Sequence, residues 1–168
     1  MGLDTARCKV SLLPVVQVDA DADSDSVNAI HHNPGKMLGG NLNYTMADAN
    51  DKWVYNDSRG VSTEGDLLGA IVTFTDASGA LASGDKIKII YIKHLGVTSS
   101  DEATTDNLWI SIDGTTPTAT NANGFILEPN EAMILKPTGL THDNLHGKSS
   151  GSDTIKIELM VLIDDVSE

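Results

Sequence analysis

Two ten-residue segments constrain the fold of this chain more than any other feature. Lys86 to Leu95 begins with alternating polar and apolar residues and then becomes apolar at consecutive positions, and Thr154 to Ile163 repeats the pattern. Alternation with a period of two puts apolar side chains on one face of a β-strand, and consecutive apolar residues indicate a strand covered on both faces. The two segments therefore predict long strands near the middle of a sheet.

Shorter segments predict further strands between turn residues. Leu68 to Phe74 reads as a strand, and Leu108 to Asp113 reads as a strand that runs into Asp113-Gly114, a strong turn signal. Trp109 is expected in the core. Val10 to Val18 is a further strand candidate, and its interruption by Pro14 indicates a sheet edge or an arm lying on another surface.

A turn separates two more predicted strands, Gly124 to Leu127 and Ala132 to Lys136. The residues between them are Glu128-Pro129-Asn130-Glu131. Proline suits the second position of a tight turn and asparagine the third. The segment is therefore predicted to be a β-hairpin.

The overall pattern predicts an all-β protein. Short strands follow one another about ten residues apart, with Gly, Asn, Asp and Pro at the turns, which favours a jelly-roll-like sandwich or barrel. Residues 1–65 carry little β-pattern and are rich in Asp, Asn and Gly. We expect an extended N-terminal region or arm with short strands over 1–65, followed by a β-sandwich domain over 66–168.

The charge of the chain limits its partners. Asp and Glu total 24 against 11 Lys and Arg, which gives a formal net charge of -13. A nucleic-acid-binding protein needs a basic surface to neutralise phosphates, and an anionic membrane repels an acidic protein. No apolar run approaches the ~20 residues that cross a bilayer. The sequence predicts a protein partner with basic patches, with no nucleic acid and no membrane.

No motif for catalysis or for a cofactor is present in the sequence. There is no Gly-x-Ser-x-Gly elbow, no phosphate-binding loop and no dinucleotide-binding glycine pattern. The single cysteine, Cys8, lies between Arg7 and Lys9, which lower a thiol pKa, but a small apolar residue in a strand is the simpler interpretation. We expect no catalytic residues, no cofactor and no enzymatic activity.

Two features of the sequence are candidate metal sites. The alternating acids Asp19, Asp21, Asp23 and Asp25 resemble a calcium loop, but Ser24 and Ile30 stand where an EF-hand needs glycine and glutamate. A solvated acidic connector is the simpler interpretation; a looser calcium site or a contact with a basic partner is the alternative. His142 and His146 have helical spacing without a helical pattern around them. The histidines are expected in surface loops, and no metal is predicted.

Three aromatic residues lie in a polar region rich in Asn and Asp: Tyr44, Trp53 and Tyr55. Exposed aromatic residues flanked by acids and amides form sugar sites or protein-binding hot spots, although packing in the core is an equal alternative. Together with Val15, Val16 and Val18 of the interrupted N-terminal strand, they are the candidate partner-binding residues.

The segment from Ile87 to Pro137 resembles a short β-module of structural proteins in tailed-phage virions. Its characteristic stretches are Asn107-Leu108-Trp109-Ile110-Ser111-Ile112-Asp113-Gly114, then Gly124-Phe125-Ile126-Leu127 after a loop with Ala and Thr. It departs from the module at the last turn, where Pro129-Asn130-Glu131 replaces Gly-Glu. The resemblance covers about a third of the chain and describes strands and turns, not a reactive site.

This resemblance implies a virion protein, and within that class a capsid decoration (cement) protein on the outer capsid surface. Such proteins are small, acidic, β-rich and often trimeric, and they bind the major capsid protein. An acidic face is repelled by packaged DNA, which favours the outside of the shell. An extended N-terminal segment could clamp a neighbouring subunit by strand addition. The alternative is a receptor- or glycan-binding adhesin module of a phage tail or head fibre, using Tyr44, Trp53 and Tyr55.

Overall fold

The fold was analysed in a computed structural model of the chain. Residues 55–68, 84–120 and 123–164 are described with their side chains, and residues 5–12, 16–18, 29–31, 38–45 and 52–54 are described as strand backbone. The chain divides into two compact units. One unit is Thr5–Tyr44, and the other comprises Met1–Asp4 and Thr45–Glu168.

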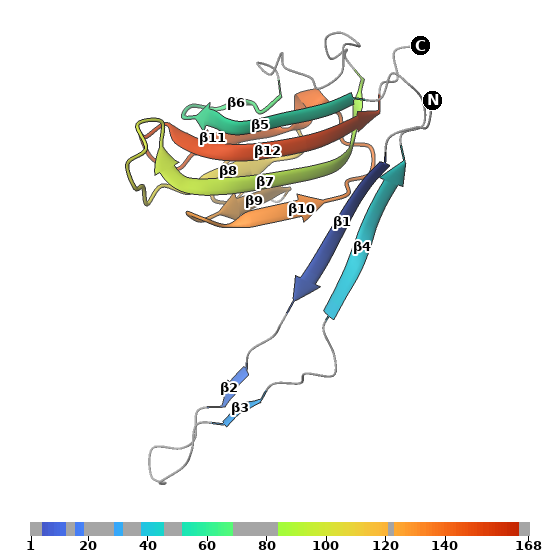
Figure 1. Cartoon of the computed structure of the whole chain (residues 1–168). Helices are drawn as coiled ribbons and strands as arrows, with labels where there is room; N and C mark the ends of the chain where they lie inside the picture. The colour runs from blue at the N-terminus through green and yellow to red at the C-terminus, as the bar shows by residue number, and fades with distance from the viewer. Residues whose placement is uncertain are drawn as a thin grey trace. The chain divides into compact units, whose positions relative to one another are not determined.

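The Thr5–Tyr44 unit contains two nested pairs of strands. β1 (Thr5–Leu12) pairs with β4 (Leu38–Thr45), and β2 (Val16–Val18) pairs antiparallel with β3 (Ala29–His31) (Figure 1). The first two strands of this unit therefore pair with its last two in reverse order. The strand expected over Val10 to Val18 overlaps the end of β1 and all of β2, and residues 13–15 with Pro14 lie outside the described residues.

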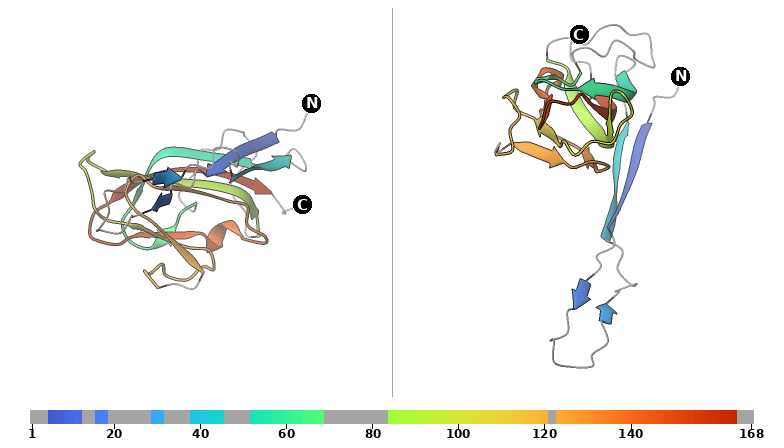
Figure 2. Two further views of the ribbon diagram at one scale, coloured as in Figure 1. Left: turned by 90° about the horizontal axis from the view of Figure 1, so that it is seen from below. Right: turned by 90° about the vertical axis from the view of Figure 1, so that its left-hand side faces the viewer.

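The larger unit contains two antiparallel sheets of four strands each. The first has the order β10-β7-β12-β5 and the second β6-β11-β8-β9 (Figure 1). Figure 2 shows the strands from two further directions. Their bounds are β5 (Lys52–Val61), β6 (Gly65–Asp66), β7 (Lys86–Thr98), β8 (Leu108–Ser111), β9 (Gly124–Leu127), β10 (Ala132–Leu135), β11 (His146–Ser149) and β12 (Ile155–Asp164). A short helical turn, η1 (His142–Asn144), precedes β11. The described residues contain no helix with the length and apolar character that crossing a bilayer requires.

The all-β prediction is confirmed for the described residues, and so is the central position of the two long strands. β7 and β12 are the inner strands of the first sheet. Their inward side chains and those of the second sheet form one buried cluster, which includes Ile87, Ile90, Ile92, Ile155, Ile157, Leu159, Val161 and Ile163 from the first sheet and Leu108, Ile110 and Leu127 from the second. The core is therefore aliphatic and lies between the two sheets.

The eight strands of the larger unit pair as a folded hairpin. β5 pairs with β12, β6 with β11, β7 with β10, and β8 with β9. From β5 to β8, successive strands lie alternately in the first and the second sheet. From β9 to β12 they alternate again, beginning in the second sheet. Two further pairings, β7 with β12 and β8 with β11, join the pairs into sheets.

This pairing overturns the predicted hairpin between residues 124 and 136. The turn itself is present: Glu131 N–H donates to the Glu128 carbonyl over 3.0 Å, and Asn130 has φ 71°, as a type II turn requires at its third position. However, β9 pairs with β8 and β10 pairs with β7, so the turn carries the chain from one sheet to the other. Turn chemistry specifies a reversal of direction and not the partner of the next strand.

The structure modifies the expectation for Trp109 and leaves two others open. Trp109 is only partly buried between the fully buried Leu108 and Ile110, because it lies on the outer face of β8, where the Lys148 ammonium lies 6.0 Å from its ring centre. The compact units divide between residues 44 and 45, and the expected boundary at 65 stays a prediction. The strand expected at Leu68 to Phe74 falls almost wholly outside the described residues.

The turn after β8 explains the Ser-Ile-Asp-Gly stretch. One Asp113 oxygen accepts hydrogen bonds from the Ser111 and Thr115 hydroxyls, both at 2.5 Å, and the other accepts from the Asn123 amide at 3.2 Å. These donors, Ser111 first, hold the pKa of Asp113 far below its usual range. Gly114 supplies the left-handed φ of 75° that closes the turn. The stretch organises a loop and places no reactive group.

We expect Ser111→Ala to raise the pKa of Asp113 towards its ordinary value. Because the folded pKa is depressed, ionised Asp113 contributes stability that is present above the unfolded pKa and is lost as pH falls through the folded one. The stability difference between wild type and variant should therefore narrow in acid. Urea unfolding across a pH series measures it, with exposed Ser152→Ala as the control; a difference independent of pH would contradict this account.

A matched pair of glycines tests the packing between β6 and β11. Gly147 and Gly65 are register partners. A Cβ at Gly147 would lie less than 2.5 Å from Leu67 Cδ2, whereas a Cβ at Gly65 would meet nothing within 4 Å. Because Leu67 is fully buried, we expect Gly147→Ala to lower the free energy of unfolding by about 1–3 kcal/mol. Gly65→Ala should change it by less than about 0.5 kcal/mol. Chemical denaturation of both variants measures the contrast, and equal effects would contradict the packing described here.

Candidate docking face

The outer face of the first sheet carries a row of aromatic and apolar side chains. Strand register places Met160 of β12 between Tyr55 of β5 and Tyr91 of β7, and Tyr91 is in turn opposite Ile134 of β10. Tyr55 is 46% exposed and Met160 37% exposed. We call these four residues, together with Glu158, the docking face. It arises because alternate residues of a strand point to opposite faces, so the positions between the buried core residues line up across the strands.

A carboxylate lies beside this row. Glu158 precedes Met160 by two residues on the same face of β12, and the Tyr55 hydroxyl donates a hydrogen bond to its Oε1 over 3.2 Å. The Tyr91 hydroxyl lies 3.5 Å from Oε2. The hydrogen bond to Glu158 raises the pKa of Tyr55; the pKa of Tyr91 is raised first by burial and then by the charge of Glu158. The carboxylate thus accepts a hydrogen bond from a tyrosine of β5 and lies at the limit of hydrogen-bond distance from a tyrosine of β7.

The lysines around this face are mostly paired. Lys156 Nζ lies 2.6 Å from Asp101 Oδ1, and Lys88 Nζ lies 2.5 Å from Asp164 Oδ2. Lys93 is the register partner of Glu158 on β7, but the ion pairs among the described residues do not include one between these two. Within the described part of the chain, Glu158 therefore has no ion-pair partner, and it lies beside an apolar row.

The candidate partner-binding residues are distributed over both units. Val16 and Val18 lie in β2 and Tyr44 in β4, and Trp53 lies in β5 opposite Leu162. The side chains of these four are outside the described residues, as is Val15. Tyr55 is the predicted residue whose side chain can be placed, and it lies on the docking face. Sequence reasoning missed Tyr91, Glu158 and Met160; the signal was their place at outward positions of the two strongest strands.

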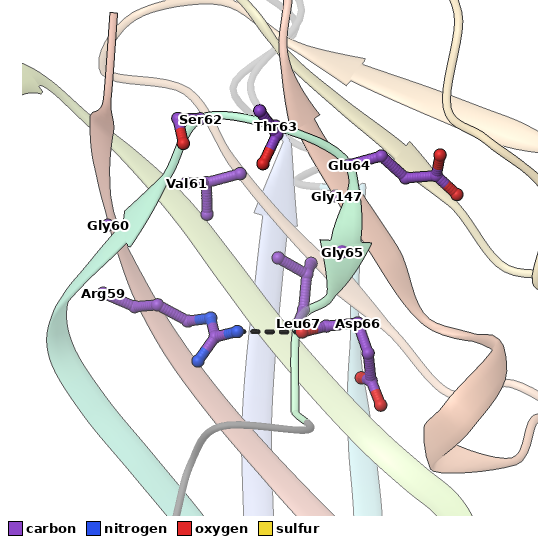
Figure 3. Close-up of a pocket in the computed structure, with 10 residues that line it drawn as sticks. All are labelled: Arg59, Gly60, Val61, Ser62, Thr63, Glu64, Gly65, Asp66, Leu67 and Gly147. Carbon is purple, nitrogen blue, oxygen red and sulfur yellow. Dashed lines mark hydrogen bonds between the residues drawn. The ribbon is translucent and has the colours of Figure 1, made fainter.

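A shallow pocket of about 180 Å³ lies at the loop that connects β5 to β6 (Figure 3). It is lined by Arg59, Gly60, Val61, Ser62, Thr63, Glu64, Gly65, Asp66, Leu67 and Gly147. Arg59 Nη2 donates to the Asp66 carbonyl over 2.8 Å, and its Nε is buried with no acceptor among the residues that the structure describes. Burial lowers the pKa of Arg59. This arginine is therefore engaged in closing the loop onto β5, and the docking face is the stronger candidate site.

The histidines with described side chains have structural contacts. His94 is fully buried: Nδ1 accepts from the Gly96 N–H at 2.9 Å, so Nε2 carries the proton and donates to the Asp106 carbonyl at 2.8 Å. His142 is buried in η1. The surface-loop expectation is wrong for both.

His146 lies in β11 and faces Glu64 Oε1 at 3.3 Å and the Asp143 carbonyl at 3.1 Å. His142 and His146 therefore share no helix. The described residues contain no group of three or more His, Cys, Asp or Glu side chains that could hold a metal ion. Asp19, Asp21, Asp23 and Asp25 lie outside the described residues.

Comparison of the chain with protein-family models, with curated proteins and with solved structures gave no match.

Glu158→Gln should lower the pKa of Tyr55, because a neutral amide removes the charge that opposes ionisation of the hydroxyl. Tyr91 should move less, since burial is the largest cause of its shift. Titration of the tyrosine ring signals by NMR measures both. Glu102→Gln, an exposed carboxylate in the loop after β7, is the control. If Glu102→Gln shifts Tyr55 equally, the effect is one of net charge and not of the hydrogen bond.

Proposed function

We propose that this chain is a virion structural protein, a decoration (cement) protein that binds the outside of a bacteriophage capsid and stabilises it without catalysis. The observation that carries the proposal is the docking face: an exposed aromatic and methionine row on a rigid sheet, in a protein with a net charge of -13. Tyrosine and methionine are enriched where proteins bind proteins. The acidic charge favours a partner with basic patches, outside the shell and away from packaged DNA.

The fold proposed with this function is a jelly roll. The nested pairs β5 with β12, β6 with β11, β7 with β10 and β8 with β9, distributed over two four-stranded sheets, support it. Jelly rolls of eight strands are common in capsid proteins. The module that resembles virion proteins spans β7 to β10, and its Ser-Ile-Asp-Gly stretch forms the turn after β8.

Stabilisation of the shell would follow from mass action. A protein that binds the assembled capsid, and not the separate capsid subunits, shifts the equilibrium towards the assembled state. Binding across the joints between major capsid proteins achieves this selectivity, because the complete binding surface exists only after assembly. We propose that the chain acts as a trimer and that the Thr5–Tyr44 unit, with its paired strands, clamps a neighbouring subunit by strand addition.

The first test is the absolute mass of the purified protein by light scattering on a sizing column. A trimer should give three times the 17.8 kDa chain mass. The second is co-sedimentation with phage heads. The heads are purified from the phage that encodes the chain, after the bound copies of this protein have been removed. Binding with a raised dissociation temperature of the heads supports the proposal. Absence of binding to heads refutes it.

Substitutions at two residues of similar exposure, one on each sheet, make the second test specific to the docking face. Tyr55 is 46% exposed and Ile126, on β9 of the other sheet, is 44% exposed. We expect Tyr55→Ala to weaken binding to heads about tenfold, as loss of a hot-spot residue does. Ile126→Ala should leave it unchanged. The reverse result would move the docking surface to the second sheet.

The glycan-binding module remains the second candidate, because the exposed tyrosine of the docking face also suits a sugar ring. A glycan array distinguishes the two. Saturable binding to a sugar that is lost in Tyr55→Ala, with no binding to heads, favours the adhesin.

A further inference from the structure

We propose that Glu158, beside Tyr55 and Tyr91, is the binding site for one cationic side chain of the docking partner, and that this side chain is an arginine. The inference rests on the proposed function in that the partner is a protein docking on this face. It goes further by assigning the chemistry that the partner must present.

The geometry of the carboxylate is the first argument. A carboxylate has about four positions at which it accepts hydrogen bonds. The Tyr55 hydroxyl occupies one at Oε1 and the Tyr91 hydroxyl approaches one at Oε2. No other donor to either oxygen is present among the described residues, which leaves one acceptor position on each oxygen. A pair of parallel N–H donors from a guanidinium group matches two oxygens of one carboxylate. The hydrogen bond from Tyr55 also restrains the carboxylate, so less side-chain freedom is lost when a cation binds.

The surroundings of Glu158 suit the rest of an arginine side chain. Met160 follows on the same face, flanked by both tyrosines in the strand register, and it is 37% exposed. Aromatic faces attract a guanidinium group, and a methionine side chain adapts its shape to an aliphatic stem. Arginine is favoured over lysine because it stacks on rings and binds a carboxylate at two points, whereas an ammonium group is a strongly hydrated point charge.

The charges on the face favour a cation from outside. Lys156 and Lys88 are held by Asp101 and Asp164. Lys93, opposite Glu158, is the nearest competitor in the register, and it forms no ion pair with Glu158 among the described residues. A docking partner can therefore supply the counter-charge that this carboxylate lacks in the described part of the chain.

The test uses three blocked tripeptides that differ in the central residue: Gly-Arg-Gly, Gly-Lys-Gly and Gly-citrulline-Gly. Citrulline has the shape of arginine without its charge. The full-length protein is titrated with each, and the ring signals of Tyr55 and Tyr91 and the methyl signal of Met160 are followed by NMR. We expect saturable shifts with arginine, several-fold weaker binding with lysine, and no saturation with citrulline.

Glu158→Gln should weaken arginine binding at least about tenfold, whereas Glu102→Gln, which removes the same charge from an exposed loop, should not. Equal binding of citrulline and arginine overturns the proposal, and this comparison needs no variant to fold. Equal losses in Glu158→Gln and Glu102→Gln also overturn it, because they indicate general attraction to an acidic protein. Shifts of the tyrosine rings with neutral methyl glycosides, and none with arginine, would assign the face to sugars.

The outcome is separable from that of the capsid experiment. If the chain binds arginine at this site and does not bind phage heads, the site stands and the cement function fails. If Glu158→Gln binds heads with unchanged affinity and the arginine peptide does not bind, the function stands and the site fails.

Discussion

The antiparallel pairing of β7 with β12 is the interaction on which the rest of the larger unit depends. It runs from Thr98 opposite Ile155 to Lys86 opposite Asp164, and each strand also carries an outer neighbour, β10 or β5. Its inner face supplies much of the apolar surface that the second sheet covers, and burial of that surface drives folding. Its outer face supplies Tyr91, Glu158 and Met160. The core and the docking face are therefore two sides of one ladder.

The local sequence pattern predicts a strand or a turn correctly where the residues of that segment themselves reflect its burial or its backbone conformation. Consecutive apolar residues in Lys86 to Leu95 and Thr154 to Ile163 identified the central strands, and Asp113-Gly114 and Pro129-Asn130 identified two turns. The predicted hairpin failed because β9 and β10 select partners elsewhere in the chain, which a turn cannot specify. Its hydrophobicity predicts Trp109 in the core. Because alternate residues of β8 point to opposite faces, Trp109 lies on the outer face, and Leu108 and Ile110 lie on the inner one.

The candidate site shows the same division. Tyr55 was identified because it stands out in a polar segment. Glu158 and Tyr91 were not, because nothing in either local sequence says that a carboxylate and a hydroxyl separated by 67 positions lie together. Only the register between β12 and β7 brings them into contact. His94 is the opposite case: its sequence gives no sign of burial, and the Gly96 N–H and the Asp106 carbonyl satisfy both of its nitrogens.

The nested pairing of the eight strands has a consequence for the order in which the fold can form. β8 and β9 are close in sequence, whereas Tyr55 and Glu158, on β5 and β12, are 103 residues apart. Closing short loops costs less chain entropy than closing long ones, so folding should proceed from β8 and β9 outward. Because β12 lies between β7 and β5, the first sheet stays incomplete until that strand has left the ribosome. We therefore expect this fold to form late and slowly. Until β12 has paired, the apolar strands of the first sheet are exposed and prone to aggregation.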